Sequence, residues 1–252
     1  MNRPAEPDTA SGLSLEQSFA RIEVTERAVA RIWLGLRTVE LIFDEARTLA
    51  DHGNRDLPLE TVALGLEHFM KVVLVLGIRQ HTGQMPDIAK LKAWRHDLRR
   101  LDRDVVTFAN DIRYGHDRPA LRDDLRFLTS DPIKDALVHV MATITDTGRY
   151  DALNELVGSD RSSHPYAHLD ALEQVLLERH QHVRELPSQG LFEVLARIHR
   201  DETVATCLRW ARALARVFTL GYCGPLGQQL KPTVGIFLNL RDDQLDCMPA
   251  WR

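Results

Sequence analysis

Histidine and arginine are the residues of this sequence whose number and spacing could support chemistry. There are 11 histidines among 252 residues, so spacings that suit metal ligands must be considered first. His164 and His168 stand four residues apart, but Pro165 lies between them and places His164 ahead of any helix. His180 and His182 are two residues apart, and a helix points such residues in different directions. The sequence has neither HExxH nor a paired Glu-x-x-His set, so we predict no metal site.

A run of basic residues between positions 90 and 103 is a second candidate site. Six lysines and arginines fall there, against Asp97 and Asp102. Apolar residues recur at helical spacing in the same stretch, so we expect Arg99 and Arg103 to project together, away from the core. Basic faces bind nucleic-acid phosphates regardless of sequence, but an ordinary solvated helix face has the same composition. The candidate RNA-binding residues are Lys92, Arg95, Arg99, Arg100 and Arg103.

A further basic set follows later in the chain. Arg209, Arg212 and Arg216 are three and four residues apart, which places them on one face of a helix. The same two interpretations apply to this set, namely phosphate binding or a solvated surface that is paired in part with neighbouring acids.

Motifs for several other reactions are missing. The sequence contains no GxGxxG, no GxxxxGK[ST] and no GxSxG, so nucleotide hydrolysis and acyl transfer are poorly supported. Cys207, Cys223 and Cys247 are odd in number and form no CxxC pair, which favours a reduced, cytoplasmic setting. We predict no cofactor.

Composition excludes several classes of protein. Hydrophobic residues make up 44% and charged residues 27%, which is typical of a soluble globular chain and excludes disorder, collagen and a disulfide scaffold. The 36 acidic and 32 basic residues give a formal net charge of −4, so overall charge points to no polyanionic partner. The most apolar stretch, 62–78, contains Glu67, His68 and Lys71, which favours a buried helix over a membrane span.

Helical periodicity dominates the chain from residue 14 to residue 220. Ser14 and Gln17 form a capping-box pattern at the start of the first helix, in which Gly35 could mark a kink. A second, largely apolar helix begins near Pro58, and a polar loop follows it. Further helices are predicted from about Asp97, after Ser130-Asp131-Pro132, over 169–183 and over 191–220.

These patterns predict one all-α domain, a multi-helix bundle. Residues 1–13 are expected to be a disordered tail, residues 14–220 the helical domain, and residues 221–252 an irregular C-terminal extension. Within the extension, Val234–Leu240 could be a short strand or an extended segment.

Two segments together resemble the HEPN superfamily of small helical domains. The first is Leu66–Leu74, with the sequence LEHFMKVVL, and the second is Trp94–Leu101, with the sequence WRHDLRRL. In that family a buried helix carrying LE and a lysine is followed by a loop and an HDL entry to the next helix. Here Glu67 and Lys71 are an i,i+4 pair of favourable orientation, and Asp97 would cap the next helix. The HEPN-like core would span about 55–185.

The resemblance implies two kinds of function. Many HEPN domains are dimeric ribonucleases of toxin–antitoxin and phage-defence systems, and they use an R-x(4–6)-H motif. Arg161 and His168 match its spacing, with His able to move a proton and Arg able to hold the phosphate. The match departs from the family in having Ser162 after the arginine, and a proline turn in its middle. Other HEPN groups lack the motif and serve as binding or assembly modules.

The sequence therefore favours a cytoplasmic, HEPN-like helical protein that binds RNA or a protein, including a second copy of itself, without catalysis and without a membrane. One alternative is a metal-independent endoribonuclease that uses Arg161 and His168. Another is a structural or regulatory helical protein with no nucleic-acid contact.

Overall fold

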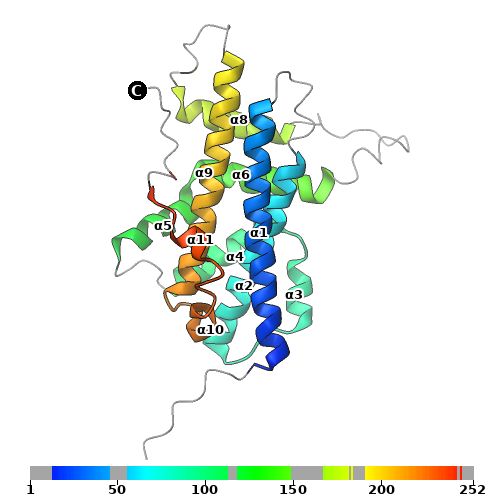
Figure 1. Cartoon of the computed structure of the whole chain (residues 1–252), viewed down its shortest axis with the longest axis vertical. Helices are drawn as coiled ribbons and strands as arrows, with labels where there is room; N and C mark the ends of the chain where they lie inside the picture. The colour runs from blue at the N-terminus through cyan, green and yellow to red at the C-terminus, as the bar shows by residue number, and fades with distance from the viewer. Residues whose placement is uncertain are drawn as a thin grey trace, which may run out of the picture.

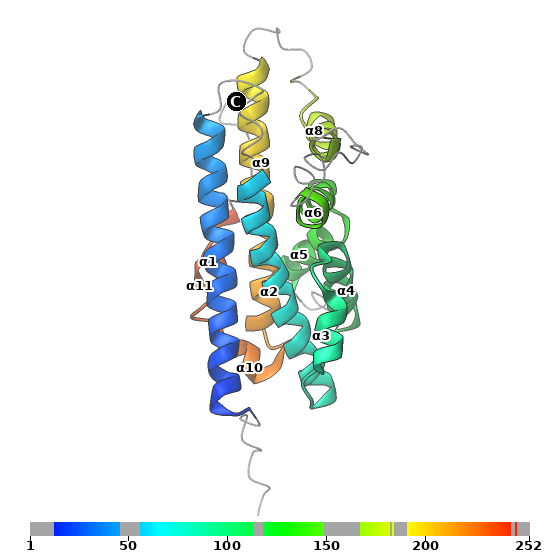
Figure 2. The same ribbon diagram turned by 90° about the vertical axis from the view of Figure 1, so that its right-hand side faces the viewer.

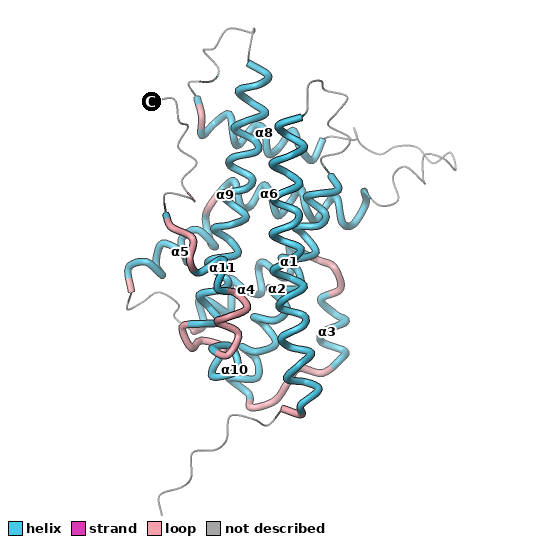
Figure 3. Tube along the Cα trace, in the orientation of Figure 1, coloured by secondary structure: helices cyan, strands magenta, loops and turns pink. Residues whose placement is uncertain are grey.

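The protein is an all-α multi-helix bundle, as the sequence predicts (Figure 1). The computed structural model describes residues 13–45, 56–112, 118–148, 167–181, 183, 191–242 and 245, and no strand occurs among them (Figure 3). Its helices are α1 (Leu15–Glu45), α2 (Asp56–Thr82), α3 (Ile88–Trp94), α4 (Leu98–Asp111), α5 (Pro119–Ser130), α6 (Pro132–Thr143), α8 (Ala167–Arg179), α9 (Leu191–Thr219), α10 (Gly224–Gln228) and α11 (Gly235–Leu238), with a π-helical turn η2 (Ile144–Gly148) after α6.

The helices form two layers. The long helices α1, α2 and α9 run along the length of the molecule, and the shorter helices α3 to α6 and α8 lie on one side of them (Figure 2). Helix α2 contacts both layers, because it packs against α1, α9, α4 and α6. Its apolar residues Leu66, Phe69 and Val73 are fully buried, and the Phe69 ring lies 5.1 Å from that of Phe218 on α9. Helix α2 is therefore the central element that positions the others.

Helix α2 is also long and apolar enough to be considered as a membrane span. Among the described residues, Leu57–Thr82 is the one segment long and apolar enough to cross a bilayer, but 67% of its most apolar window is buried inside the fold. That burial is typical of a core helix, and it is compatible with a soluble protein.

The start of α1 confirms the predicted capping box. The backbone N–H of Ser14 donates to Gln17 Oε1, and the backbone N–H of Gln17 donates to Ser14 Oγ, both at 3.1 Å. These bonds satisfy two of the backbone donors that a helix start leaves free. Helix α1 is described as far as Glu45, and residues 46–55 lie outside the described part of the chain.

Glycines allow α1 and α2 to approach closely. A Cβ on Gly35 would lie 2.6 Å from Val62 Cγ2, and a Cβ on Gly65 would lie 2.8 Å from the backbone nitrogen of Ile32. Any side chain at these positions would therefore push the two helices apart. Gly35, where the sequence allows a kink, lies at this close contact between the two helices.

Three predictions about the elements need correction. The predicted polar loop before Asp97 contains α3, which Asp87 caps by accepting from the backbone N–H of Lys90 at 2.7 Å. Helix α5 was not predicted, although Pro119 suits its first turn. The predicted strand or extended segment, Val234–Leu240, instead carries α11, whose Phe237 is fully buried beside Phe69. Phe237 thereby contacts α2, and α11 packs against α9.

Some predicted features fall on residues outside the description. The tail predicted over 1–13 lies there, apart from Leu13, which is buried. The same holds for the end of the predicted C-terminal extension beyond residue 245. The HEPN-like core that we predict over about 55–185 spans α2 to α8 and stays a prediction.

Candidate nucleic-acid interface

The predicted RNA-binding residues gather on α3, α4 and the turn between them. Each of them has an exposed side chain, and we call the set the basic surface: Lys92, Arg95, Arg99, Arg100 and Arg103. The buried Trp94 on α3 supports this surface. Its Nε1–H donates to Asp104 Oδ2 on α4 at 2.9 Å. The two short helices are thereby held against each other by an indole whose polar atom is satisfied.

The acids in this stretch are bound to structural partners. Asp97 caps α4 by accepting from the backbone N–H of Arg100 at 2.9 Å, and this confirms the predicted cap. Asp87 caps α3, and Asp104 accepts from Trp94 as described above. Asp102 turns inward and accepts from Lys134 Nζ at 2.8 Å. These carboxylates keep their negative charge, but in the described part of the chain none of them forms an ion pair with a member of the basic surface.

The turn between α3 and α4 is fixed to the central helix. Lys71 Nζ donates both to Glu67 Oε1 at 2.6 Å and to the backbone oxygen of Arg95 at 2.5 Å. The first of these bonds confirms the predicted Glu67–Lys71 pair. Arg95 has a φ of +44°, a conformation that a residue with a side chain adopts only where its surroundings impose it. The Lys71 bond to its carbonyl is one such restraint, so the position of Arg95 is set by α2.

His96 completes the attachment of the turn. Its Nδ1 lies 3.1 Å from Glu67 Oε2, and the carboxylate is buried whereas the imidazole side chain is 66% exposed. A carboxylate only accepts hydrogen bonds, so Nδ1 is the donor in this contact. Such a pair can orient an imidazole for proton transfer, although here Lys71 also neutralises the carboxylate. Sequence reasoning placed His96 at the helix entry but missed its contact with Glu67, which joins residues 29 positions apart.

Two of the five basic side chains also have intramolecular partners. Arg99 Nη2 lies 3.0 Å from His139 Nδ1 and donates to Thr143 Oγ1 at 3.1 Å, so it bridges α4 to α6. Arg100 Nη1 donates to the backbone oxygen of Ala93 at 2.7 Å. Within the described part of the chain, no hydrogen bond or ion pair engages the side chains of Lys92, Arg95 and Arg103. These three cations are therefore available to an external anion.

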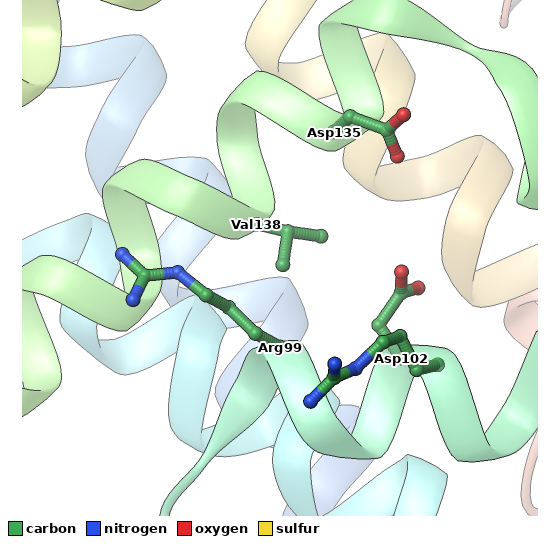
Figure 4. Close-up of a pocket in the computed structure, with 5 residues that line it drawn as sticks. Arg99, Asp102, Asp135 and Val138 are labelled. Atoms are coloured by element: carbon green, nitrogen blue, oxygen red, sulfur yellow. The ribbon is translucent and has the colours of Figure 1, made fainter.

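A cavity opens beside the basic surface, between α4 and α6. It has a volume of about 320 Å³, and its lining includes Arg99, Asp102, Arg103, Asp135 and Val138. Figure 4 shows the Arg99 guanidinium at one side and the Asp102 and Asp135 carboxylates at the other. Arg99 and Arg103 thus share one face of α4, as predicted, but that face borders a neighbouring helix.

Asp102 and Lys134 form a buried ion pair at the floor of this cavity. The Lys134 side chain is 1% exposed, and Nζ also donates to the backbone oxygen of Leu128 at 2.7 Å. Burial raises the pKa of Asp102, and the positive charge of Lys134 opposes that rise. The pair joins α4 to α6 beside the cavity.

The predicted catalytic pair lies at the edge of what the structure describes. Arg161 falls outside the described residues, and His168 is the second residue of α8, with its side chain also outside them. Neither residue is therefore placed relative to the basic surface. Among the described residues, no group of three or more His, Cys, Asp and Glu side chains could hold a metal ion.

A second histidine–carboxylate pair, this one buried, lies away from this surface, where α8 meets α9. His180 Nε2 lies 2.7 Å from Glu202 Oε1, and both side chains are buried. Arg179 Nε also approaches this carboxylate, at 3.4 Å. The contact fastens the end of α8 to α9. The chain matches no family model, no curated protein and no solved structure, so a functional proposal must rest on these contacts.

Proposed function

We propose that this chain is a HEPN-like, cytoplasmic, non-catalytic module that binds RNA through the basic surface of α3 and α4. The single observation that carries the proposal is the pairing of charges in this stretch. The carboxylates of Asp97, Asp102 and Asp104 are bound to structural partners, whereas Lys92, Arg95 and Arg103 have no described partner. The five cations of the basic surface outnumber these three carboxylates, of which Asp102 is offset by Lys134, so this surface carries an excess of positive charge although the chain as a whole has a net charge of −4.

The attachment of the turn between α3 and α4 to helix α2 supports the same proposal. Lys71 and His96 tie the turn to α2, so the cations around it are presented from a rigid base. Binding a phosphate backbone then costs less ordering of the protein than binding by a loose loop would cost. Arginine also stacks on unpaired bases, which suits single-stranded RNA. The choice of RNA over DNA rests on the HEPN resemblance, as does a phage-defence or toxin–antitoxin setting.

The experiment measures binding of a short fluorescein-labelled single-stranded RNA by anisotropy, across a series of salt concentrations. The test variant is the double change Arg95→Glu and Arg103→Glu. The matched control is Arg27→Glu with Arg37→Glu, which alters the net charge equally at two exposed positions of α1. Figure 2 places α1 and α3 on opposite sides of the molecule.

We expect the test variant to lose affinity by at least about tenfold, and the salt slope to fall by roughly 1.4 if two phosphate contacts are lost. The control should bind as the wild type does. Equal affinity of test variant and control would overturn the proposal. Binding of a protein or a second copy of the chain, with no RNA binding by the wild type, would favour the structural or protein-binding alternative.

The endoribonuclease alternative is tested with the same RNA. Cleavage that His168→Ala abolishes, with the helical circular dichroism unchanged, would replace the non-catalytic proposal by the nuclease one. Intact RNA after prolonged incubation with the wild type is the expected result.

A further inference from the structure

A second cavity lies between α5, α9 and the turn near the C-terminal end of the described chain. Figure 1 shows these three segments side by side. The cavity has a volume of about 330 Å³, and its lining includes Arg126, Arg209, Arg212, Arg216, Asp124 and Asp242. The three arginines that the sequence placed on one face of a helix thus line a single cavity. It shares no lining residue with the basic surface, and the inference below does not depend on RNA binding.

Arg212 is the central cation of this cavity. The residue is 6% exposed, and its Nη1 donates to the backbone oxygen of Leu240 at 3.2 Å and to Asp242 Oδ1 at 2.7 Å. Its Nε is buried and has no partner among the described atoms, and Nη2 likewise bonds to no described residue. A guanidinium nitrogen without a partner donates readily to a carboxylate or phosphate oxygen. Nε has almost no accessible surface, so a group in the cavity would meet Nη2, the guanidinium nitrogen that has no described partner and is not fully buried.

Arg209 supplies a second cation without a carboxylate partner. Its guanidinium lies 4.7 Å from the centre of the Phe127 ring, which holds it by a cation–π contact. No ion pair with a described acid engages it. Its charge reaches the cavity from a restrained position, where it also acts on the nearby Asp242 carboxylate and helps to lower the pKa of that group.

Arg216 and Asp124 form a closed pair at the wall of the cavity. Arg216 Nη1 donates to both carboxylate oxygens of Asp124, at 3.0 and 2.9 Å, and Asp124 is 2% exposed. Arg126 pairs with Asp123 at the rim. Three of the four arginines that line the cavity are thus paired with its three aspartates. The charge of Arg209 remains in excess, so the cavity favours an anion.

We propose that this cavity is a binding site for a phosphate monoester, whose phosphoryl group is held between Arg209 and Nη2 of Arg212. A dianionic phosphoryl group has three terminal oxygens, enough to accept from both guanidiniums at once. The volume of the cavity falls at the lower end of small-ligand sites, which leaves room for the group that the phosphate esterifies.

Asp242 acts as a competitor within this site. Its side chain is 84% exposed, yet its carboxylate binds Arg212 and brings a negative charge to the cavity. An exposed carboxylate is held weakly, because water screens the pair. A phosphoryl group that enters must outweigh or displace this charge, so removal of the charge should tighten binding.

Isothermal titration calorimetry on the full chain tests the site, with AMP as the probe and with inorganic phosphate and adenosine as comparison ligands. We expect AMP and phosphate to bind and adenosine not to bind. The change Arg209→Gln should weaken AMP binding at least about tenfold, as loss of one charge-assisted contact implies. The change Asp242→Asn should strengthen it severalfold.

The control is Arg197→Gln, an exposed arginine of α9 that lines neither cavity. It should leave AMP binding unchanged. Because Arg209 and Asp242 are not fully buried, both test variants are expected to fold, and circular dichroism verifies this. The proposal fails if AMP does not bind the wild type, if adenosine binds as well as AMP, or if Arg209→Gln and Asp242→Asn both bind as the control does.

Discussion

The imidazole of His96 and the carboxylate of Glu67 are in contact, with Nδ1 of the former 3.1 Å from Oε2 of the latter. Glu67 lies on the buried face of the central helix, and His96 lies in the exposed turn that precedes α4. One carboxylate therefore receives both this imidazole and the ammonium group of Lys71. The contact therefore attaches the turn, and with it the basic surface, to the central helix α2.

Replacement of Glu67 by glutamine should loosen this attachment. The amide keeps the shape of the side chain but removes the charge that Lys71 and His96 share, so we expect a loss of about 1–3 kcal/mol in the free energy of unfolding. Urea denaturation followed by circular dichroism measures it. Glu26→Gln is the matched control, because Glu26 is an exposed acid of α1 without a described partner. If both variants unfold at the same urea concentration, the attachment contributes nothing to stability.

His68 should make the stability of the protein depend on pH. Burial lowers the pKa of His68 below its ordinary value of 6.5; the Glu67 carboxylate opposes this shift and Arg31 adds to it. Arg31 Nη1 lies 3.0 Å from Nδ1 of the ring, a contact that suits the neutral imidazole.

The direction of the effect follows from the two pKa values. The unfolded chain binds a proton at His68 as the pH falls through about 6.5, whereas the folded chain does not until a lower pH. The contribution of His68 is therefore fully present above the unfolded pKa and is lost as the pH falls through the folded pKa. Urea denaturation across this range should show the decline in the wild type and a shallower one in His68→Gln. Equal slopes would contradict this role for His68.

The buried pair of Asp102 and Lys134 should tolerate loss of both charges better than loss of one. Lys134→Met leaves Asp102 buried without its partner, and we expect a cost of roughly 3–5 kcal/mol. The double change Lys134→Met with Asp102→Leu should recover most of that stability, since no buried charge then remains. Thermal denaturation of the single and double variants tests this order of stability. A double variant no more stable than the single variant would contradict the prediction.

Gly65→Ala should separate α1 from α2. The new Cβ would lie 2.8 Å from the backbone nitrogen of Ile32 and 2.9 Å from the backbone oxygen of Ala28, and backbone atoms cannot move aside as a side chain can. We expect a destabilisation of about 1–3 kcal/mol. The matched control is Gly235→Ala in α11, where a Cβ would meet nothing within 4 Å. A melting temperature lowered equally by both changes would show that contact between α1 and α2 is not the cause.

The local elements could be predicted from the sequence because their signals are local. Ser14 with Gln17 marks the start of α1, and Asp97 marks the start of α4, since each cap needs only residues three positions apart. The i,i+4 spacing of Glu67 and Lys71 likewise fixes their contact within one helix. Helices α3 and α11 were missed because each is at most seven residues long, too short for a periodic pattern to emerge.

The amino-acid sequence by itself determined the all-α class, the long helices and the faces on which the arginines lie. Only the tertiary structure decided which of those arginines have a carboxylate partner and which do not. Asp242 reaches Arg212 across 30 residues, and Lys134 takes Asp102 away from the basic surface across 32. Such pairings depend on how helices distant in the sequence pack together. Helical periodicity fixes the direction of a side chain but not the residue that it meets.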